Sequence, residues 1–162
     1  MHYAPFYERF PDLARTETRS VTIKDHPFLP DGEYRLIETY CKQPGCDCRR
    51  VMFNIYTPDS AEPLAVIAYG WGSAAFYTRW FGKYNADIIR EMQGPILNSA
   101  SPQSKLAPAL LRLVHEVLRD KAYVARLKRH YELYKRAVNE EADDKPPKPR
   151  RRRIPKPKRR RR

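Results

Sequence analysis

The chain of 162 residues lacks the features of several common protein classes. No stretch approaches the roughly 20 consecutive apolar residues that a membrane-spanning helix needs. The first six residues show no basic segment followed by an apolar run, so the sequence predicts no secretory signal. The three cysteines are odd in number and lie close together, which disfavours a secreted disulfide framework. We therefore expect a protein of a reducing compartment, in the cytoplasm or nucleoid, or in the nucleus of a eukaryotic source.

Patterns typical of catalysis are also missing. The sequence contains no paired carboxylates, no Ser/His/Asp set and no His-Glu-x-x-His run. Residues 70–73, Gly-Trp-Gly-Ser, are too short for a phosphate-binding loop and lack its lysine, and they are not a Gly-x-Ser-x-Gly nucleophile elbow. We expect a protein that is not an enzyme. The aromatic side chains of residues 69–81 are expected to fill the interior, although exposed ones would stack on bases.

The three cysteines define the most informative segment, residues 40–50. Cys41, Cys46 and Cys48 have the spacing Cys-x4-Cys-x-Cys, with Pro44-Gly45 as a turn in the longer gap. Apolar and polar residues alternate before and after this segment, a pattern that predicts two strands of a β-hairpin. A connection that brings three thiols together suits Zn²⁺, which takes four tetrahedral ligands and favours thiolate sulfur. The sequence therefore predicts a zinc knuckle.

A structural zinc site needs a fourth ligand, and the sequence offers two histidines for it. His26 is the first choice because it precedes the hairpin, and His115 is the second because it faces the apolar side of a predicted helix. If water fills the position instead, the site is open and potentially catalytic. Two other interpretations remain: three reduced cysteines without metal, or a redox pair of Cys46 and Cys48. His130, in a basic helix, is expected to be solvated.

The remaining pattern predicts an α+β fold: a small antiparallel β-sheet followed by about four α-helices. Strands are expected near residues 33–40, 51–56 and 64–69, with an edge strand in 16–24. Ser73, Asn85 and Asp120 are the expected N-caps of helices over 74–81, 86–93 and 121–139, and Ser101-Pro102 is expected to open another. In the last helix, Lys135 is placed on the outer face with the other basic residues. Residues 1–144 form a single predicted domain.

The positive charge is concentrated at the C-terminus. Residues 145–162 contain 12 basic residues, five prolines and no acidic residue, whereas residues 1–144 hold 20 basic and 19 acidic residues. Such a segment cannot bury enough apolar surface to order itself, so we predict a disordered or polyproline-like tail. Clustered arginines neutralise phosphates and release counterions. The residues expected to contact nucleic acid are Lys148, Arg150, Arg151, Arg152, Arg153, Lys156, Lys158, Arg159, Arg160, Arg161 and Arg162.

These observations lead to one favoured function and two alternatives. The favoured hypothesis is a metal-stabilised, non-enzymatic module that binds the phosphate backbone of DNA or RNA, or a ribonucleoprotein, without sequence specificity through its tail. The first alternative is an adaptor whose sheet and aromatic face bind a protein partner, while the tail serves localisation or solubility. The second is a zinc-dependent hydrolase with an open three-cysteine site. No membrane partner is expected.

Four segments together resemble a family of small, uncharacterised bacterial proteins. They are the knuckle Tyr-Cys-x4-Cys-Asp-Cys-Arg-Arg-Val at 40–51, Ala-Val-Ile-Ala-Tyr-Gly-Trp at 65–71, Gly-Pro-Ile-Leu at 94–97 and Ser-Pro-Gln-Ser-x-Leu-Ala-Pro at 101–108. The resemblance covers roughly residues 30–138 and implies no particular activity. It implies that the basic tail is an addition to a shared body.

Overall fold

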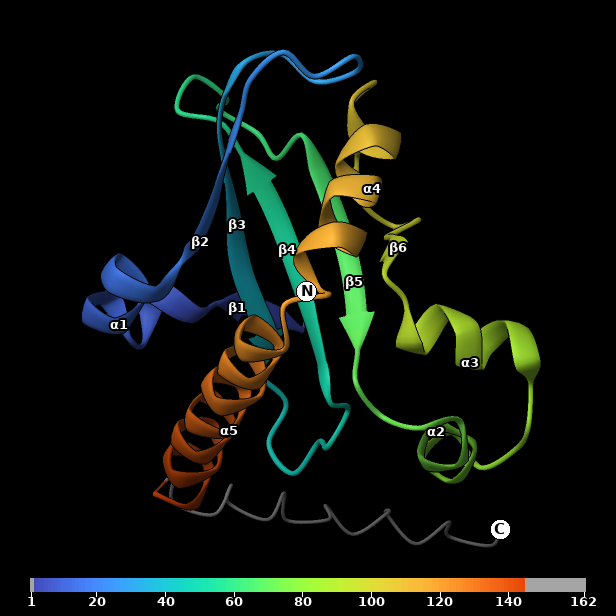
Figure 1. The fold of residues 1–162 in the computed structure, drawn as a ribbon. Helices are drawn as coiled ribbons and strands as arrows, with labels where there is room; N and C mark the ends of the chain where they lie inside the picture. The colour runs from blue at the N-terminus through green and yellow to red at the C-terminus, as the bar shows by residue number, and fades with distance from the viewer. Residues whose placement is uncertain (1, 145–162) are drawn as a thin grey trace, which may run out of the picture.

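The computed structural model describes residues 2–144, and the predicted tail 145–162 lies outside the described residues. Strands dominate the first half of this region, where β2 to β5 follow one another without an intervening helix, and helices dominate the second half (Figure 1). The strands are β1 (Tyr3–Pro5), β2 (Arg19–Ile23), β3 (Gly32–Cys41), β4 (Arg50–Tyr56), β5 (Ala65–Gly70) and β6 (Ile96–Leu97). The helices are the 3₁₀ turn η1 (Phe6–Glu8), then α1 (Pro11–Glu17), α2 (Ala74–Phe81), α3 (Ala86–Gln93), α4 (Ala107–Val117) and α5 (Lys121–Asp143).

All strands of the described region form one antiparallel sheet, which confirms the predicted α+β fold class. The path runs β1-β3-β4-β5-β6, and β2 also pairs with β3. Strands β1 and β2 therefore pair with different parts of the same edge of the long strand β3. β1 pairs with its last residues, 39–41, while β2 pairs with its first residues, 32–36. The predicted edge strand is β2, whereas β1 and β6 carried too few residues to be recognised from the sequence.

One face of the sheet is covered by α4 and α5 (Figure 1). The predicted alternation holds: Leu36 pairs with Ile55, and Phe53 pairs with Ile67, so the buried side chains of three strands share this face. Leu110 of α4 and Leu127 of α5 are fully buried in the same cluster. Burial of this apolar surface supplies the main stabilisation of the fold.

Three of the four predicted helix caps are correct. Ser73 accepts a hydrogen bond from the backbone N–H of Phe76, and Asn85 and Asp120 cap α3 and α5 in the same way. The helix expected to begin at Ser101-Pro102 starts instead at Ala107, with Pro108 in its first turn. No helix within residues 2–144 combines the length and apolar character needed to cross a membrane.

Residues 101–104 are used for something other than capping. The side chain of Gln103 accepts from the backbone N–H of Val66 at 3.0 Å and donates to the Val66 carbonyl at 3.0 Å. It therefore completes hydrogen bonds along β5 where β6 has ended. This pairing holds the segment in an extended turn and delays the helix by several residues.

His130 is buried, and the prediction that it is solvated is wrong. Its ring is 1% exposed and is held between two carboxylates. Nδ1 lies 2.7 Å from Oε2 of the buried Glu38, and Nε2 lies 2.7 Å from Oε2 of Glu17. Tyr40 donates a further hydrogen bond to Glu38 at 2.8 Å, and Arg129 pairs with Glu17. This network fastens α1, β3 and α5 to one another.

The network predicts a dependence of stability on pH. Burial alone lowers the pKa of His130, but hydrogen bonds and charges from Glu38 and Glu17 outweigh it and raise the pKa above the usual value. The hydrogen bond from His130 holds the pKa of Glu17 below its ordinary range. The His130 contribution is therefore complete below about pH 6.5 and is lost as pH rises through the raised pKa. The Glu17 contribution is present above about pH 4.5 and is lost on acidification through its lowered pKa.

We expect the free energy of unfolding of the wild type, minus that of His130→Gln, to be largest between about pH 5 and 6.5. Urea denaturation of both proteins from pH 4 to 9 measures this difference. Other titrating groups are common to the two proteins and largely cancel. A difference that does not change between pH 6 and 9 would contradict a charged His130.

Candidate metal centre

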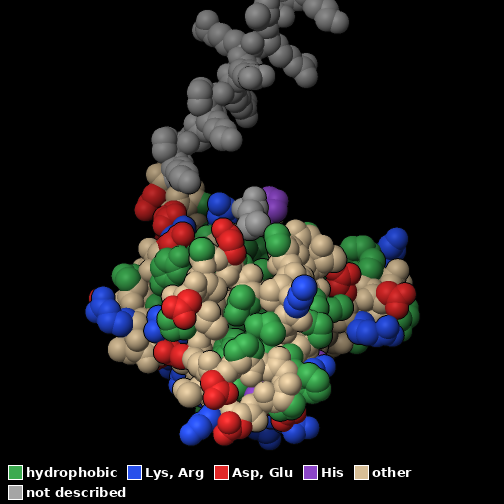
Figure 2. Space-filling view, turned by 90° about the horizontal axis from the view of Figure 1, so that it is seen from above, with side chains coloured by type: hydrophobic (Ala, Val, Ile, Leu, Met, Phe, Trp, Pro, Cys, Tyr) green, Lys and Arg blue, Asp and Glu red, His purple; other side chains and the backbone are tan. Residues whose placement is uncertain are grey.

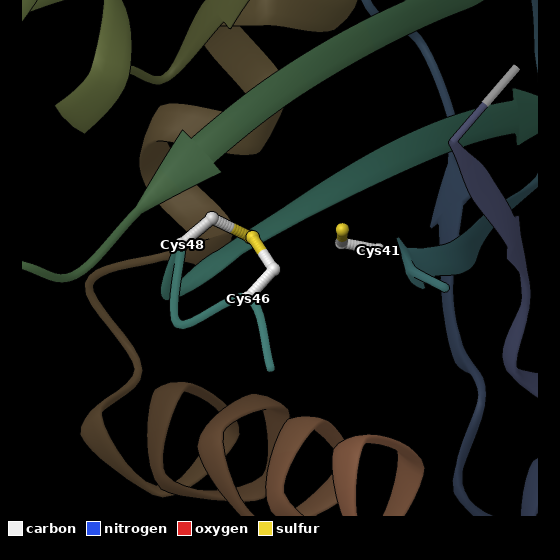
Figure 3. Close-up of side chains that lie close together, drawn as sticks. All are labelled: Cys41, Cys46 and Cys48. Atoms are coloured by element: carbon white, nitrogen blue, oxygen red, sulfur yellow. The ribbon is translucent and has the colours of Figure 1, made fainter. Parts of the chain in front are cut away.

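The three cysteines converge at one end of the sheet. Cys41 is the last residue of β3, and Cys46 and Cys48 lie in the loop that leads to β4. Their sulfur atoms all lie within 4.8 Å of one another. Figure 3 shows Cys46 and Cys48 side by side, with Cys41 facing them from the end of β3. Thiolates bound to one tetrahedral zinc ion at 2.3 Å would be roughly 3.8 Å apart, so the cluster can hold a metal ion after small side-chain movements.

The knuckle loop is held from the side of α5. Gly45 has a φ of 69°, the left-handed conformation that the turn requires. Its backbone N–H donates to Oδ1 of Asn139 at 2.9 Å. The N–H of Cys46 donates to the Gln43 carbonyl at 3.3 Å and closes the turn. These hydrogen bonds hold the backbone between Cys41 and Cys46 without the help of a metal ion.

Lys135 is a second support for the loop, although the sequence placed it on the outer face of its helix. The residue is 7% exposed. Its Nζ donates to the carbonyl oxygens of Gln43 at 2.6 Å and Cys41 at 3.2 Å. The buried ammonium group therefore receives partners from the knuckle backbone and places a positive charge beside the thiols.

A third support comes from Tyr77 of α2. Its hydroxyl lies 3.2 Å from the carbonyl of Cys48 and 3.1 Å from that of Arg49, and it accepts from the N–H of Gly72 at 3.3 Å. A Cβ added at Gly70 would lie 2.3 Å from the Tyr77 hydroxyl, and one at Gly72 would lie 2.8 Å from its ring. These two glycines therefore make room for Tyr77, which is buried as expected. The same expectation is wrong for Trp80 and Phe81, which are 44% and 41% exposed.

Because the three thiols lie close together, their pKa values are shifted in different directions. The pKa of Cys41 is lowered to about 5, first by a hydrogen bond from Cys48 and further by the backbone N–H of Gln43 and the charge of Lys135. The pKa of Cys48 is raised by its hydrogen bond to Cys41, by burial and by the neighbouring thiolates. The pKa of Cys46 is raised by burial and by the charge on Cys41.

This pattern indicates that the three thiols share one negative charge and that loss of a second proton is disfavoured. A divalent cation among the sulfurs would remove that resistance, so metal binding would release protons from Cys46 and Cys48. Tyr3 provides an outer contact because its hydroxyl lies 3.8 Å from Sγ of Cys48. Donation from a hydroxyl stabilises a coordinating thiolate. The donor set and its surroundings thus fit a thiophilic metal ion.

The predicted fourth ligands do not join the cluster. Nδ1 of His26 accepts from the backbone N–H groups of Phe28 and Leu29, each at 3.1 Å, and caps a turn before β3. Strand β3 lies between His26 and Cys41 in the chain, and its ten extended residues span about 30 Å. His115 is exposed on α4 and lines the same hollow as His26. Within residues 2–144, no histidine or carboxylate atom lies within 4.8 Å of all three sulfurs.

A shallow hollow of about 440 Å³ lies beside the cluster. It is lined by Cys46, the half-exposed thiol, and by Trp71, Tyr131 and Lys128 among others. Arg49 closes one side, with its guanidinium paired to Asp47 at 3.1 Å. The metal position is therefore reached from solvent past Cys46, while Cys41 and Cys48 are buried.

Comparison with known proteins adds nothing to this geometry, since no family model, no curated protein and no solved structure matches the chain. The resemblance to a bacterial family thus stays a prediction.

Proposed function

We propose that this protein is a zinc-stabilised, non-enzymatic module that contacts the phosphate backbone of DNA or RNA, free or in a ribonucleoprotein, through residues 145–162. The observation that carries the proposal is the division of charge. Twelve basic residues without an acid follow a body with 20 basic and 19 acidic residues. Sequence-independent affinity for nucleic acid arises from such clustered cations.

Zinc is the proposed metal because all three donors are thiols. Soft thiolate ligands favour zinc, copper(I) and iron–sulfur clusters over magnesium, calcium or manganese. Iron–sulfur clusters usually take four cysteines, and the chain has three. A single zinc ion with a fourth ligand from solvent or another donor fits this set best.

The arrangement of α5 gives the zinc site a role in presenting the tail. Lys135 and Asn139, both from α5, bond to the knuckle backbone, and the helix ends at Asp143. Metal bound to the knuckle would therefore stabilise the helix from which the basic segment continues. This is a structural role, which requires no reaction at the metal.

A hydrolase is the weaker alternative for an electrostatic reason. Three thiolates around Zn²⁺ give the centre a net charge of −1. A water bound there is less acidic than one bound by neutral histidines, as in carbonic anhydrase. The adaptor hypothesis is supported by the exposed aromatic side chains, but it does not explain the charge of residues 145–162.

The proposal predicts that the full chain binds duplex and single-stranded nucleic acid at low salt, with affinity falling steeply as salt rises. Engagement of all 12 cations on duplex DNA would give a slope of log affinity against log salt near −11. Replacing Arg159, Arg160, Arg161 and Arg162 with glutamine is expected to reduce that slope by up to about 3.6. Fluorescence anisotropy from 25 to about 300 mM salt gives both values.

A matched control removes four cations from the body. Lys24, Lys105, Lys121 and Arg136 are exposed, and their joint replacement by glutamine changes the net charge equally. We expect this control to retain most of the slope. Equal losses in the two variants would show that net charge alone is responsible, and no binding by the wild type at low salt would end the proposal.

A further inference from the structure

The last turn of α2 and the connection to α3 expose three large aromatic side chains. Trp80 and Phe81 are 44% and 41% exposed, and Tyr84 is 71% exposed. We call this group, with the neighbouring cations Arg79 and Lys83, the aromatic tip. Helices α2 and α3 lie beside the sheet, away from α5 (Figure 1), and hydrophobic and charged side chains lie together in the lobe at the right of Figure 2.

Helix α2 packs onto the body through a residue outside the aromatic tip. The helix is fixed to the body through Tyr77, which is fully buried and bonded to the knuckle. The next turn leaves Trp80 and Phe81 partly exposed and ends at Gly82, whose φ of 85° stops the helix. Exposed Tyr7 and Phe28 lie in other elements, whereas the aromatic tip places three such rings within five residues. A cluster of this kind is typical of a binding surface.

All charged residues of the chain segment that carries these rings, residues 63–86, are positive. No aspartate or glutamate occurs in residues 63–86. Within the described chain, neither Arg79 nor Lys83 forms an ion pair, and Lys83 Nζ lies 5.8 Å from the centre of the Phe81 ring. The nearest acid along the chain, Asp87, pairs with Arg90 at 3.4 Å. Aromatic faces and free cations therefore alternate over a few residues.

We propose that the aromatic tip binds the unpaired bases of single-stranded nucleic acid, an inference that rests on the proposed function and names its preferred substrate. Every base has a face that stacks on Trp, Tyr or Phe, and adjacent cations engage the phosphates between bases. Bases inside a duplex are already stacked and do not reach such rings. The body thereby distinguishes single strands from duplexes, while residues 145–162 add affinity for both.

The test measures binding of the full chain to a 12-nucleotide oligodeoxythymidylate and to a mixed-sequence duplex of 12 base pairs. Replacing Trp80 and Tyr84 together with alanine is expected to weaken binding of the oligonucleotide by about tenfold or more. Binding of the duplex should change by less than about twofold. Quenching of tryptophan fluorescence by the oligonucleotide should disappear in Trp80→Phe, which keeps a stacking ring and so keeps most of the affinity.

Tyr7→Ala/Phe28→Ala is the matched control because it removes two exposed aromatic rings from other elements. It is expected to leave both affinities unchanged. Equal effects of the two double variants, or equal losses for oligonucleotide and duplex, would overturn the inference while leaving the proposed function intact. Loss of binding to anionic phosphatidylserine vesicles, with unchanged oligonucleotide binding, would instead assign the aromatic tip to membranes. A wild type that binds neither nucleic acid would overturn both proposals.

Discussion

From the proposed zinc site we expect one zinc ion per wild-type chain and none in Cys46→Ser, whose melting temperature should be about 10–15 °C lower in zinc-containing buffer. A ligand present at 1,000 times its dissociation constant stabilises the folded state by about 4 kcal/mol. For a chain of this size, that stabilisation corresponds to a shift of this order. Metal analysis by mass spectrometry and thermal melts with and without a chelator give the two quantities.

Cys46 is the best of the three cysteines for this test because it is only half-buried, so serine there costs little apart from the metal. The control is Asp47→Asn, which alters the adjacent side chain without touching a sulfur. The Asp47→Asn variant should keep its metal content, and chelation should lower its melting temperature as in the wild type. If chelation leaves the wild type unchanged and purified protein contains no metal, the three thiols have no metal-binding role.

His130→Leu is expected to destabilise the protein by about 3–5 kcal/mol, because it leaves the carboxylate of Glu38 buried without its charged partner. The corresponding fall in melting temperature is roughly 10–15 °C. Leucine has a similar volume to histidine, so a cavity contributes little. Chemical denaturation monitored by circular dichroism measures the change.

The double variant Glu38→Leu/His130→Leu separates loss of charge pairing from loss of packing. It removes both buried polar groups, and Tyr40 keeps the carbonyl of Leu127 as an acceptor at 3.1 Å. We expect it to recover at least half of the stability lost in the single variant. His115→Leu, at an exposed histidine, should change stability by less than about 0.5 kcal/mol. A double variant as unstable as the single one would mean that Glu38 is not the cause.

The three-thiol cluster could be predicted from the sequence because its geometry is local. Cys41, Cys46 and Cys48 lie within eight residues around a Pro-Gly turn, so any compact turn brings them together. The fourth ligand could not be predicted because its position depends on how distant segments are arranged in space. His26 lies only fifteen residues before Cys41, but the intervening strand is extended and carries the two to opposite ends of the sheet.

The two buried polar residues of α5, Lys135 and His130, were misplaced for a different reason. Lys135 follows Tyr131 by four residues and precedes Val138 by three, and His130 follows Leu127 by three residues and precedes Tyr134 by four. Helical spacing alone would have put both on the buried face. Their charge argued otherwise, since burial of a charged group needs partners. Those partners, the knuckle carbonyls and Glu38, lie about 90 residues away in the sequence, where no local pattern reveals them.

Support of the knuckle by α5 has a consequence for synthesis on the ribosome. Gly45 and Asn139, which bond to each other, are separated by 94 residues. At about 5–20 residues per second, roughly 5–20 seconds pass between their additions to the growing chain. During that interval the three thiols leave the ribosome before the helix that later packs against the knuckle has been made. Early capture of zinc would protect the nascent knuckle from oxidation until α5 arrives.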